Sequence, residues 1–134
     1  MGAARGIRDW PTGIVPRFSQ PELLSTLEAV PLDWLDDLDF GVIVMDREDR
    51  VLAYNADESK RSGLARQRVL GRNFFVDVGP CMNNYLVAER FHEQAQLDEQ
   101  LDYVLTFVMR PTPVRLRLLA GAGSGRQYLV LRSR

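Results

Sequence analysis

The sequence predicts an α+β fold in which a five-stranded antiparallel sheet carries helices on one face, with a helical cap at the N-terminus. The apolar segments come in the order of two strands, several short helices, one longer helix and three strands. Sequential antiparallel strands separated by helices form a sheet with the helices packed against one face. The 134 residues, 46% of them hydrophobic, are enough for one such domain.

Residues 1–38 form the predicted N-terminal cap, because four prolines interrupt them and prevent long regular elements. A short helix is expected to begin with Ser19 as its N-cap and with Glu22 three residues later, the spacing of a capping box. A second short helical piece is expected at 32–38. Tryptophans and leucines in this segment indicate that it packs on the rest of the chain, a predicted core of residues 39–134.

The elements of the core follow from local hydrophobic patterns. Alternating and β-branched residues predict strands, and apolar residues at helical spacing predict helices. The expected strands are 41–45, 51–55, 101–109, 114–118 and 128–131, and the expected helices are 55–61, 65–70 and 85–96. The first two strands form a hairpin, and the last three follow one another along the chain. This order resembles the plan of a PAS domain.

Charge and composition exclude several classes of function. Seventeen basic and eighteen acidic residues leave a net charge of −1, whereas a general nucleic-acid binder carries a basic field. No apolar run approaches the roughly 20 residues that span a bilayer, and the chain starts without a signal-peptide core. One cysteine and one histidine exclude a multi-cysteine metal site and an internal disulfide. We therefore expect a cytoplasmic protein, monomeric or weakly dimeric, that binds neither nucleic acid nor membranes.

Tyr54, Glu58 and Ser62 recur every four residues along a predicted helical stretch, which places them on one stripe. If this stripe faces inward, three hydrogen-bonding side chains point toward a shared partner. The alternative is a tyrosine ring that packs at the edge of the core, with Glu58 and Ser62 in solvent.

Cys81 follows Gly79-Pro80 and comes shortly before a helical stretch. A thiol near a helix start meets the positive end of the helix dipole, so Cys81 is a candidate nucleophile or attachment point. The alternative is a buried structural thiol. A cysteine hydrolase would need His92 as its base, and because His92 lies well inside the predicted helix, an enzyme is the least favoured class.

Two motifs resemble the photoactive yellow protein family of PAS domains. They are Tyr54-Asn-Ala-Asp-Glu58 and Gly71-Arg-Asn-Phe-Phe-Val-Asp-Val-Gly-Pro-Cys81, and the matching order continues in Met109-Arg-Pro-Thr-Pro-Val and Tyr128-Leu-Val-Leu-Arg. The resemblance covers residues 39–134, whereas 1–38 corresponds only in position to the cap of that family. It favours the inward-facing stripe and a reactive Cys81 over their alternatives.

The resemblance implies a p-coumaric acid chromophore (4-hydroxycinnamic acid) joined as a thioester to Cys81. Its phenolate end would be held by Tyr54 and Glu58. Ser62 stands where the family usually has threonine, and either hydroxyl can donate a hydrogen bond to Tyr54. Further positions around the chromophore are Phe74, Val78, Gly79, Pro80, Phe107 and Met109.

Leu64 departs from the family pattern, which has an arginine lid at this position. A leucine can shield the chromophore by packing, but it supplies neither a charge nor a hydrogen-bond donor. Arg61 and Arg66 are close in the sequence and do not occupy the lid position.

The resemblance further implies a blue-light photoreceptor rather than an enzyme. Light would drive trans–cis isomerisation, Glu58 would give up its proton, and the uncompensated buried carboxylate would loosen the cap. If the cap covers the chromophore side, it would stabilise the closed dark state. An unidentified downstream signalling protein would respond to that change. The alternative is a PAS module that senses another ligand or a protein partner and carries no covalent chromophore. The segment 71–81 does not match the motif of flavin-binding PAS photoreceptors.

Overall fold

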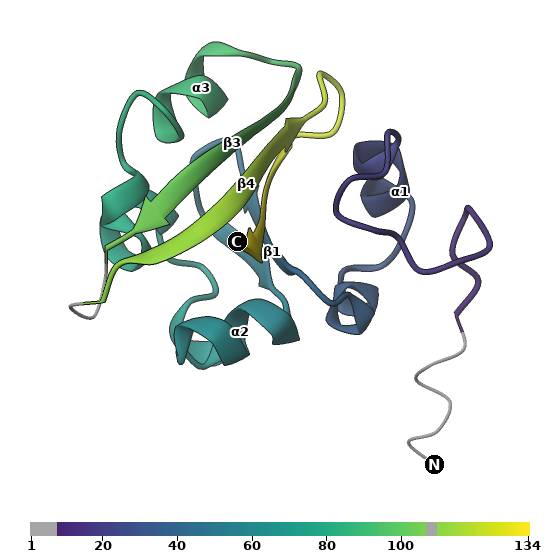
Figure 1. The fold of residues 1–134 in the computed structure, drawn as a ribbon. Coiled ribbons are helices and arrows are strands. Elements are labelled where there is room, and N and C mark those ends of the chain that lie inside the picture. The colour runs from purple at the N-terminus through teal and green to yellow at the C-terminus, as the bar shows by residue number, and fades with distance from the viewer. Residues whose placement is uncertain (1–7, 107–109) are drawn as a thin grey trace.

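The computed structural model describes residues 8–106 and 110–134, and it confirms the predicted α+β fold (Figure 1). Its antiparallel sheet has the strand order β2-β1-β5-β4-β3. The strands are β1 (Gly41–Asp46), β2 (Val51–Tyr54), β3 (Leu97–Leu105), β4 (Thr112–Ala120) and β5 (Arg126–Ser133). The α-helices are α1 (Leu23–Glu28), α2 (Ala56–Ser62) and α3 (Ala88–Glu93), the 3-10 helices are η2 (Leu32–Asp37), η3 (Arg66–Arg68) and η5 (Pro80–Met82), and η4 (Phe74–Val78) is a π-helix.

Successive residues of β1 point to opposite faces of the sheet and belong to two separate cores. Ile43 and Met45 pack with the apolar side chains of the helical segments between β2 and β3. Val42 and Val44 pack with the N-terminal segment on the other face. The sheet therefore separates two hydrophobic cores, and Figure 1 shows α1 on one side of it and α3 on the other.

The N-terminal segment packs on the sheet through buried side chains. Leu23 and Leu27 of α1 and Leu35 of η2 are almost completely buried and share a core with Tyr128 and Val130 of β5. Because these apolar surfaces leave water together, the segment is held by the same hydrophobic effect that stabilises a domain core.

A buried arginine of β4 also fastens the N-terminal segment to the sheet. Arg117 Nη1 donates to the carbonyl oxygens of Phe18 (2.7 Å) and Gln20 (2.8 Å). Its Nε and Nη2 each lie 2.9 Å from a different carboxylate oxygen of Asp98 in β3. This bidentate pair orients the guanidinium toward backbone carbonyls that would otherwise be unpaired.

The predicted Ser19 N-cap is wrong. Helix α1 begins at Leu23, and its N-cap residue, Glu22, makes no side-chain capping bond. Gln20 supplies the local side-chain contact instead, since its Nε2 donates to Thr26 Oγ1 at 3.1 Å. Pro21 disfavours helical backbone in the preceding residue, so the chain makes a turn before the helix starts.

The boundary between α3 and β3 also differs from the prediction. The helix expected at 85–96 covers only Ala88–Glu93, and β3 begins at Leu97 rather than at 101. Asn84 Oδ1 accepts hydrogen bonds from the backbone N–H groups two and three residues further on, and a turn at 85–87 precedes the helix. The last residues of the strand expected at 101–109 lie outside the described residues.

Candidate functional site

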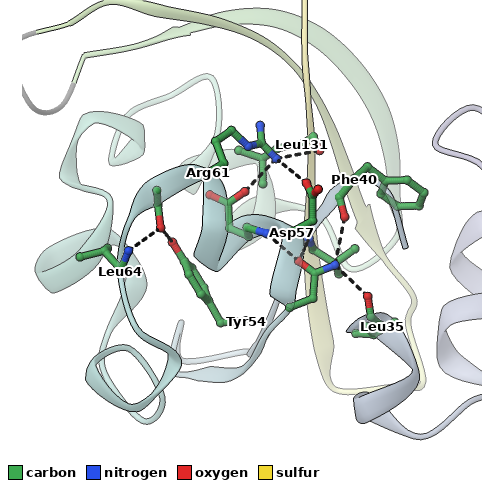
Figure 2. Close-up of polar contacts among 11 residues, drawn as sticks. Leu35, Phe40, Tyr54, Asp57, Arg61, Leu64 and Leu131 are labelled. Atoms are coloured by element: carbon green, nitrogen blue, oxygen red, sulfur yellow. Dashed lines mark hydrogen bonds and ion pairs between the residues drawn. The ribbon is translucent and has the colours of Figure 1, made fainter. Parts of the chain in front are cut away.

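Asn55 begins helix α2 and ties it to the rest of the fold (Figure 2). Its Oδ1 accepts from the backbone N–H groups of Glu58 (3.2 Å) and Val42 (2.9 Å). Its Nδ2 donates to the carbonyl oxygens of Leu35 in η2 (2.8 Å) and Phe40 (3.0 Å). Because every polar atom of this buried amide has a partner, the first turn of α2 has a fixed place against β1 and η2.

A cavity of about 190 Å³ lies against α2, on the face of the sheet opposite to the N-terminal segment. An engineered cavity of about 150 Å³ binds benzene, so this volume has room for one aromatic ring. Apolar side chains make up most of the wall. The lining residues are Tyr54, Glu58, Ser62, Leu64, Phe74, Val78, Gly79, Met82 and Leu105.

The position of this cavity corrects one expectation about the cap. Segment 8–38 packs on the opposite face of the sheet, with Val42, Val44 and Tyr128, and so it does not cover the cavity. The local sequence carries no signal for this, because an amphipathic segment can bury its apolar side on either face of a sheet.

Tyr54 points its hydroxyl toward the end of α2. Its Oη donates to Ser62 Oγ at 2.9 Å, and Ser62 Oγ also accepts from Leu64 N–H at 3.1 Å (Figure 2). The expected bond therefore runs in the opposite direction, from tyrosine to serine. Burial, together with the charge of Glu58, raises the pKa of Tyr54 to about 12, so at neutral pH its hydroxyl keeps its proton and is a hydrogen-bond donor.

Glu58 is a buried carboxyl on the wall of this cavity. Burial raises its pKa from an ordinary value of 4.5 to about 7, against the opposing effect of Arg61, whose Nη2 lies 3.0 Å from Glu58 Oε1. Gly41 leaves the space for this approach, because a Cβ there would clash with both side chains. Glu58 can therefore hold a proton or lose it near neutral pH, and the resulting charge is not isolated.

Two arginines near Leu64 in the sequence are engaged away from the lid position. Arg61 contacts Glu58 and does not line the cavity, and Arg66 Nη2 lies 2.8 Å from Asp36 Oδ1. Leu64 itself lines the cavity and is 38% exposed, so it covers part of the opening with an apolar side chain.

Cys81 belongs to the single turn of η5 and is half-buried against the core around the cavity. It is not itself a lining residue, but Gly79 and Met82 on either side of it are. Its carbonyl oxygen accepts hydrogen bonds from Tyr103 Oη of β3 (2.6 Å) and Asn84 Nδ2 (3.2 Å). These bonds fix the backbone that carries the thiol beside the cavity.

Gly79 also brings the chain close to an aromatic wall residue. A Cβ at this position would lie 2.7 Å from the ring of Phe74, so a larger residue would displace that ring. The close packing of Gly79 on Phe74 sets where η5 and Cys81 stand relative to η4.

The structure brings most of the candidate side chains around one cavity. Seven of them line it: Tyr54, Glu58, Ser62, Leu64, Phe74, Val78 and Gly79. Pro80 and Cys81 lie in the chain between the lining residues Gly79 and Met82 and are not lining residues themselves, and Phe107 and Met109 lie outside the described residues. The analysis of the sequence missed two lining residues, Met82 and Leu105. Met82 follows the cysteine directly, and Leu105 lies on the inward face of β3, so both could have been found.

His92 lies outside the cavity lining and forms a different contact. Its Nε2 is 2.8 Å from Asp49 Oδ2, whose other oxygen accepts from Gln127 Nε2 at 3.0 Å. Within residues 8–106 and 110–134, no three metal-ligating side chains gather, and no helix is long and apolar enough to cross a membrane.

Comparison with known proteins decides the family. No family model matches the chain. The chain is 33% identical over 105 residues to photoactive yellow protein of Rhodothalassium salexigens, covering 76% of this chain and 84% of that protein. It is 32% identical over 107 residues to photoactive yellow protein of Halochromatium salexigens, covering 78% and 86%. The chain belongs to the photoactive yellow protein family.

Solved structures agree with this assignment. The photoactive yellow protein domain of a sensor histidine kinase from Rhodospirillum centenum superposes with a TM-score of 0.74 and 32% identity, over 81% of this chain and 98% of that domain. A PAS domain from Haloarcula marismortui, 17% identical, superposes with a TM-score of 0.58 over 86% of this chain and 100% of that domain. The predicted PAS fold is thus confirmed, and the chain is a member of a family of PAS photoreceptors.

Proposed function

We propose that this protein is a blue-light photoreceptor that carries a p-coumaroyl group as a thioester on Cys81. One observation carries the proposal: a cavity with room for an aromatic ring is lined by a buried tyrosine, a buried carboxyl, and the residues Gly79 and Met82 that flank Pro80 and the single cysteine in the chain. Membership of the photoactive yellow protein family supports it. When bound, the p-coumaroyl group would supply the absorption of blue light and a trans–cis isomerisation.

The residues present fit such a group. Phe74, Val78, Met82 and Leu105 offer apolar surface to a ring and its chain. A phenol has a pKa of about 10, so it is an anion at neutral pH only where the protein donates hydrogen bonds to its oxygen. Tyr54 stays protonated, and its hydroxyl would be such a donor once it turns from Ser62 Oγ toward the phenolate oxygen.

Glu58 would be the proton source of this site. Burial raises its pKa to about 7, so a small change in its surroundings moves its proton on or off at neutral pH. In the protonated form it is a second donor beside Tyr54. In the ionised form it would lie 3.0 Å from Arg61. The expectation of an uncompensated carboxylate is therefore wrong for this chain.

The signal would pass from α2 to the N-terminal segment. Asn55 joins the start of α2 to Leu35 of η2, and Asp36 Oδ1 accepts from Ala56 N–H at 2.8 Å. A change in the charge of Glu58 would act on a helix that is hydrogen-bonded to the segment proposed to loosen.

We place this sensor in the cytoplasm, where a reducing environment keeps the thiol free. Its target would be a separate signalling protein, and it would have no enzymatic activity of its own.

The test is to add activated p-coumarate to the apoprotein and to measure intact mass and the visible spectrum. We expect the mass of one p-coumaroyl group per chain, a visible band and its reversible bleaching by blue light. Cys81→Ala should remain folded and gain neither mass nor colour. A mass increase in Cys81→Ala, or no increase in the folded parent protein, would contradict the proposal. The latter result would favour a PAS sensor without a covalent chromophore.

A further inference from the structure

We infer that Arg61 is the counter-ion of Glu58 and that it determines, from the solvent side of α2, how readily this carboxyl gives up its proton. The inference deepens the proposed function and rests on it for its meaning in signalling. Arg61 is a positioning residue, because it touches the carboxyl and does not line the cavity.

One guanidinium nitrogen makes three contacts at once. Arg61 Nη2 lies 3.0 Å from Glu58 Oε1 and 3.4 Å from Asp57 Oδ2, and it donates to the carbonyl oxygen of Leu131 in β5 at 3.2 Å (Figure 2). The bond to β5 anchors the arginine to the sheet, so its charge is held beside the carboxyl. A fixed charge acts on a buried carboxyl more strongly than a mobile surface charge does.

The three side chains form a gradient from the interior to the solvent. Glu58 is 5% exposed, Arg61 is 16% exposed and Asp57 is 34% exposed. Glu58 faces the aromatic cavity, whereas Arg61 and Asp57 line a separate polar pocket on the surface. The other residues of this pocket are Asp39, Lys60, Arg132 and Ser133. The buried carboxyl therefore has a polar connection to solvent that does not pass through the cavity.

The other groups around Glu58 do not replace this cation. Asp57, on the same helix, favours the neutral form of the carboxyl, as burial does. Tyr54 from β2 and Ser62 from α2 bond to each other and carry no charge. Gly41 of β1 has no side chain to offer. Arg61 is the charged group that opposes burial and lowers the pKa of Glu58.

The position of the cation has a consequence for signalling. The family pattern puts an arginine at the lid, where this chain has Leu64, and the structure puts a cation next to the proton source instead. Loss of the Glu58 proton then forms an ion pair in place of an isolated buried charge. The loosening of the N-terminal segment that results from the buried charge would therefore be smaller in this protein than in a variant without Arg61.

The test follows the protonation of Glu58 in the apoprotein by the infrared carbonyl band of its neutral carboxyl, with Glu58→Gln as the blank. In Arg61→Leu the midpoint should move up by about 1–3 pH units, because an opposite charge at this distance has an effect of that size. Arg61→Lys should restore most of the original midpoint. Lys60→Leu, which removes a charge from the same surface pocket, should leave it in place.

An unchanged midpoint in Arg61→Leu, or an equal shift in Lys60→Leu, would overturn the inference. Arg61→Gln is measured in parallel, because its amide can still donate to Leu131 and it decides the matter if the leucine variant does not fold. None of these measurements needs a chromophore. Failure of p-coumarate to attach would therefore contradict the proposed function and leave this result standing.

Discussion

The two faces of the sheet are filled in different ways. Edge-to-face aromatic pairs occur on both faces, with centroids 5.4 Å apart for Trp10 and Trp34 behind the N-terminal segment and 5.1 Å apart for Phe74 and Phe75 on the opposite face. On that opposite face, buried residues also surround a cavity of about 190 Å³ whose wall includes a buried carboxyl. Close packing stabilises a fold, whereas a cavity and a buried ionisable group cost stability and serve function.

The two faces are connected at α2 and at β4. At α2, Asn55 holds the helix against η2. At β4, Arg117 binds the carbonyl oxygens of Phe18 and Gln20 on the cap side. Because Glu58 lies on α2, a charge change in the cavity reaches the first connection directly. The connection at Arg117 is anchored to the sheet, so it should persist when the connection at Asn55 is disturbed.

The largest effect should come from the same truncation made on each face. Phe40→Ala, in the closely packed core, should lower the free energy of unfolding by about 3–5 kcal/mol. Phe74→Ala should cost at least about 1 kcal/mol less, because Phe74 already borders empty space and loses fewer contacts. Denaturant unfolding measures both. Equal costs would show that the two cores are packed alike.

The pH dependence of stability should reveal the buried carboxyl. Burial raises the pKa of Glu58 in the folded chain to about 7, so its contribution is fully present below pH 4.5 and is lost as the pH rises through 7. In Glu58→Gln the free energy of unfolding does not lose this contribution as the pH rises, because the amide does not titrate. Relative to the parent, the variant should gain about 3 kcal/mol between pH 4 and pH 8. A difference that does not change with pH would mean that Glu58 titrates normally.

A smaller effect is expected at the connection between the faces. Asn55→Ala removes the N-cap of α2 and leaves the Leu35 carbonyl without its donor, so stability should fall by about 2 kcal/mol. Limited proteolysis should then cut the N-terminal segment faster. Ser59→Ala is the control, because it removes a hydroxyl of the same helix that donates to the Leu64 carbonyl oxygen and not to the N-terminal segment. Unchanged proteolysis in Asn55→Ala would show that the amide does not hold the segment.

The smallest effect concerns Leu64. In the p-coumarate-loaded protein, Leu64→Arg should lower the pH at which the visible band of the phenolate is lost, because a nearby cation favours the charged form. Leu64 is 38% exposed, so the shift should stay below about one pH unit. Leu64→Gln separates charge from size. Equal midpoints in parent and arginine variant would mean that position 64 does not act on the chromophore.

Local patterns were enough to predict much of the fold and of the site. Alternation located the strands. The four-residue spacing of Tyr54 and Glu58 left their orientation open, and the resemblance of their motif to the family favoured the inward orientation that places both on the cavity wall. Tyr54 ends β2 and is not part of the predicted helical stripe. The role of Arg61 could not be predicted in this way. The direction of the Arg61 guanidinium depends on its hydrogen bond to the carbonyl oxygen of Leu131, which lies 70 positions away in the chain. The face covered by the cap was likewise set by long-range packing with β5, of which the N-terminal sequence gives no sign.

Hydrogen–deuterium exchange of the p-coumarate-loaded protein, in darkness and under blue light, tests the central claim most directly. The claim is that a change in the cavity on one face releases the segment on the other. We expect faster exchange under light in α1 and η2, little change in β4 and β5, and return to the original rates in darkness. Bleaching of the visible band with unchanged exchange in α1 and η2 would contradict the account.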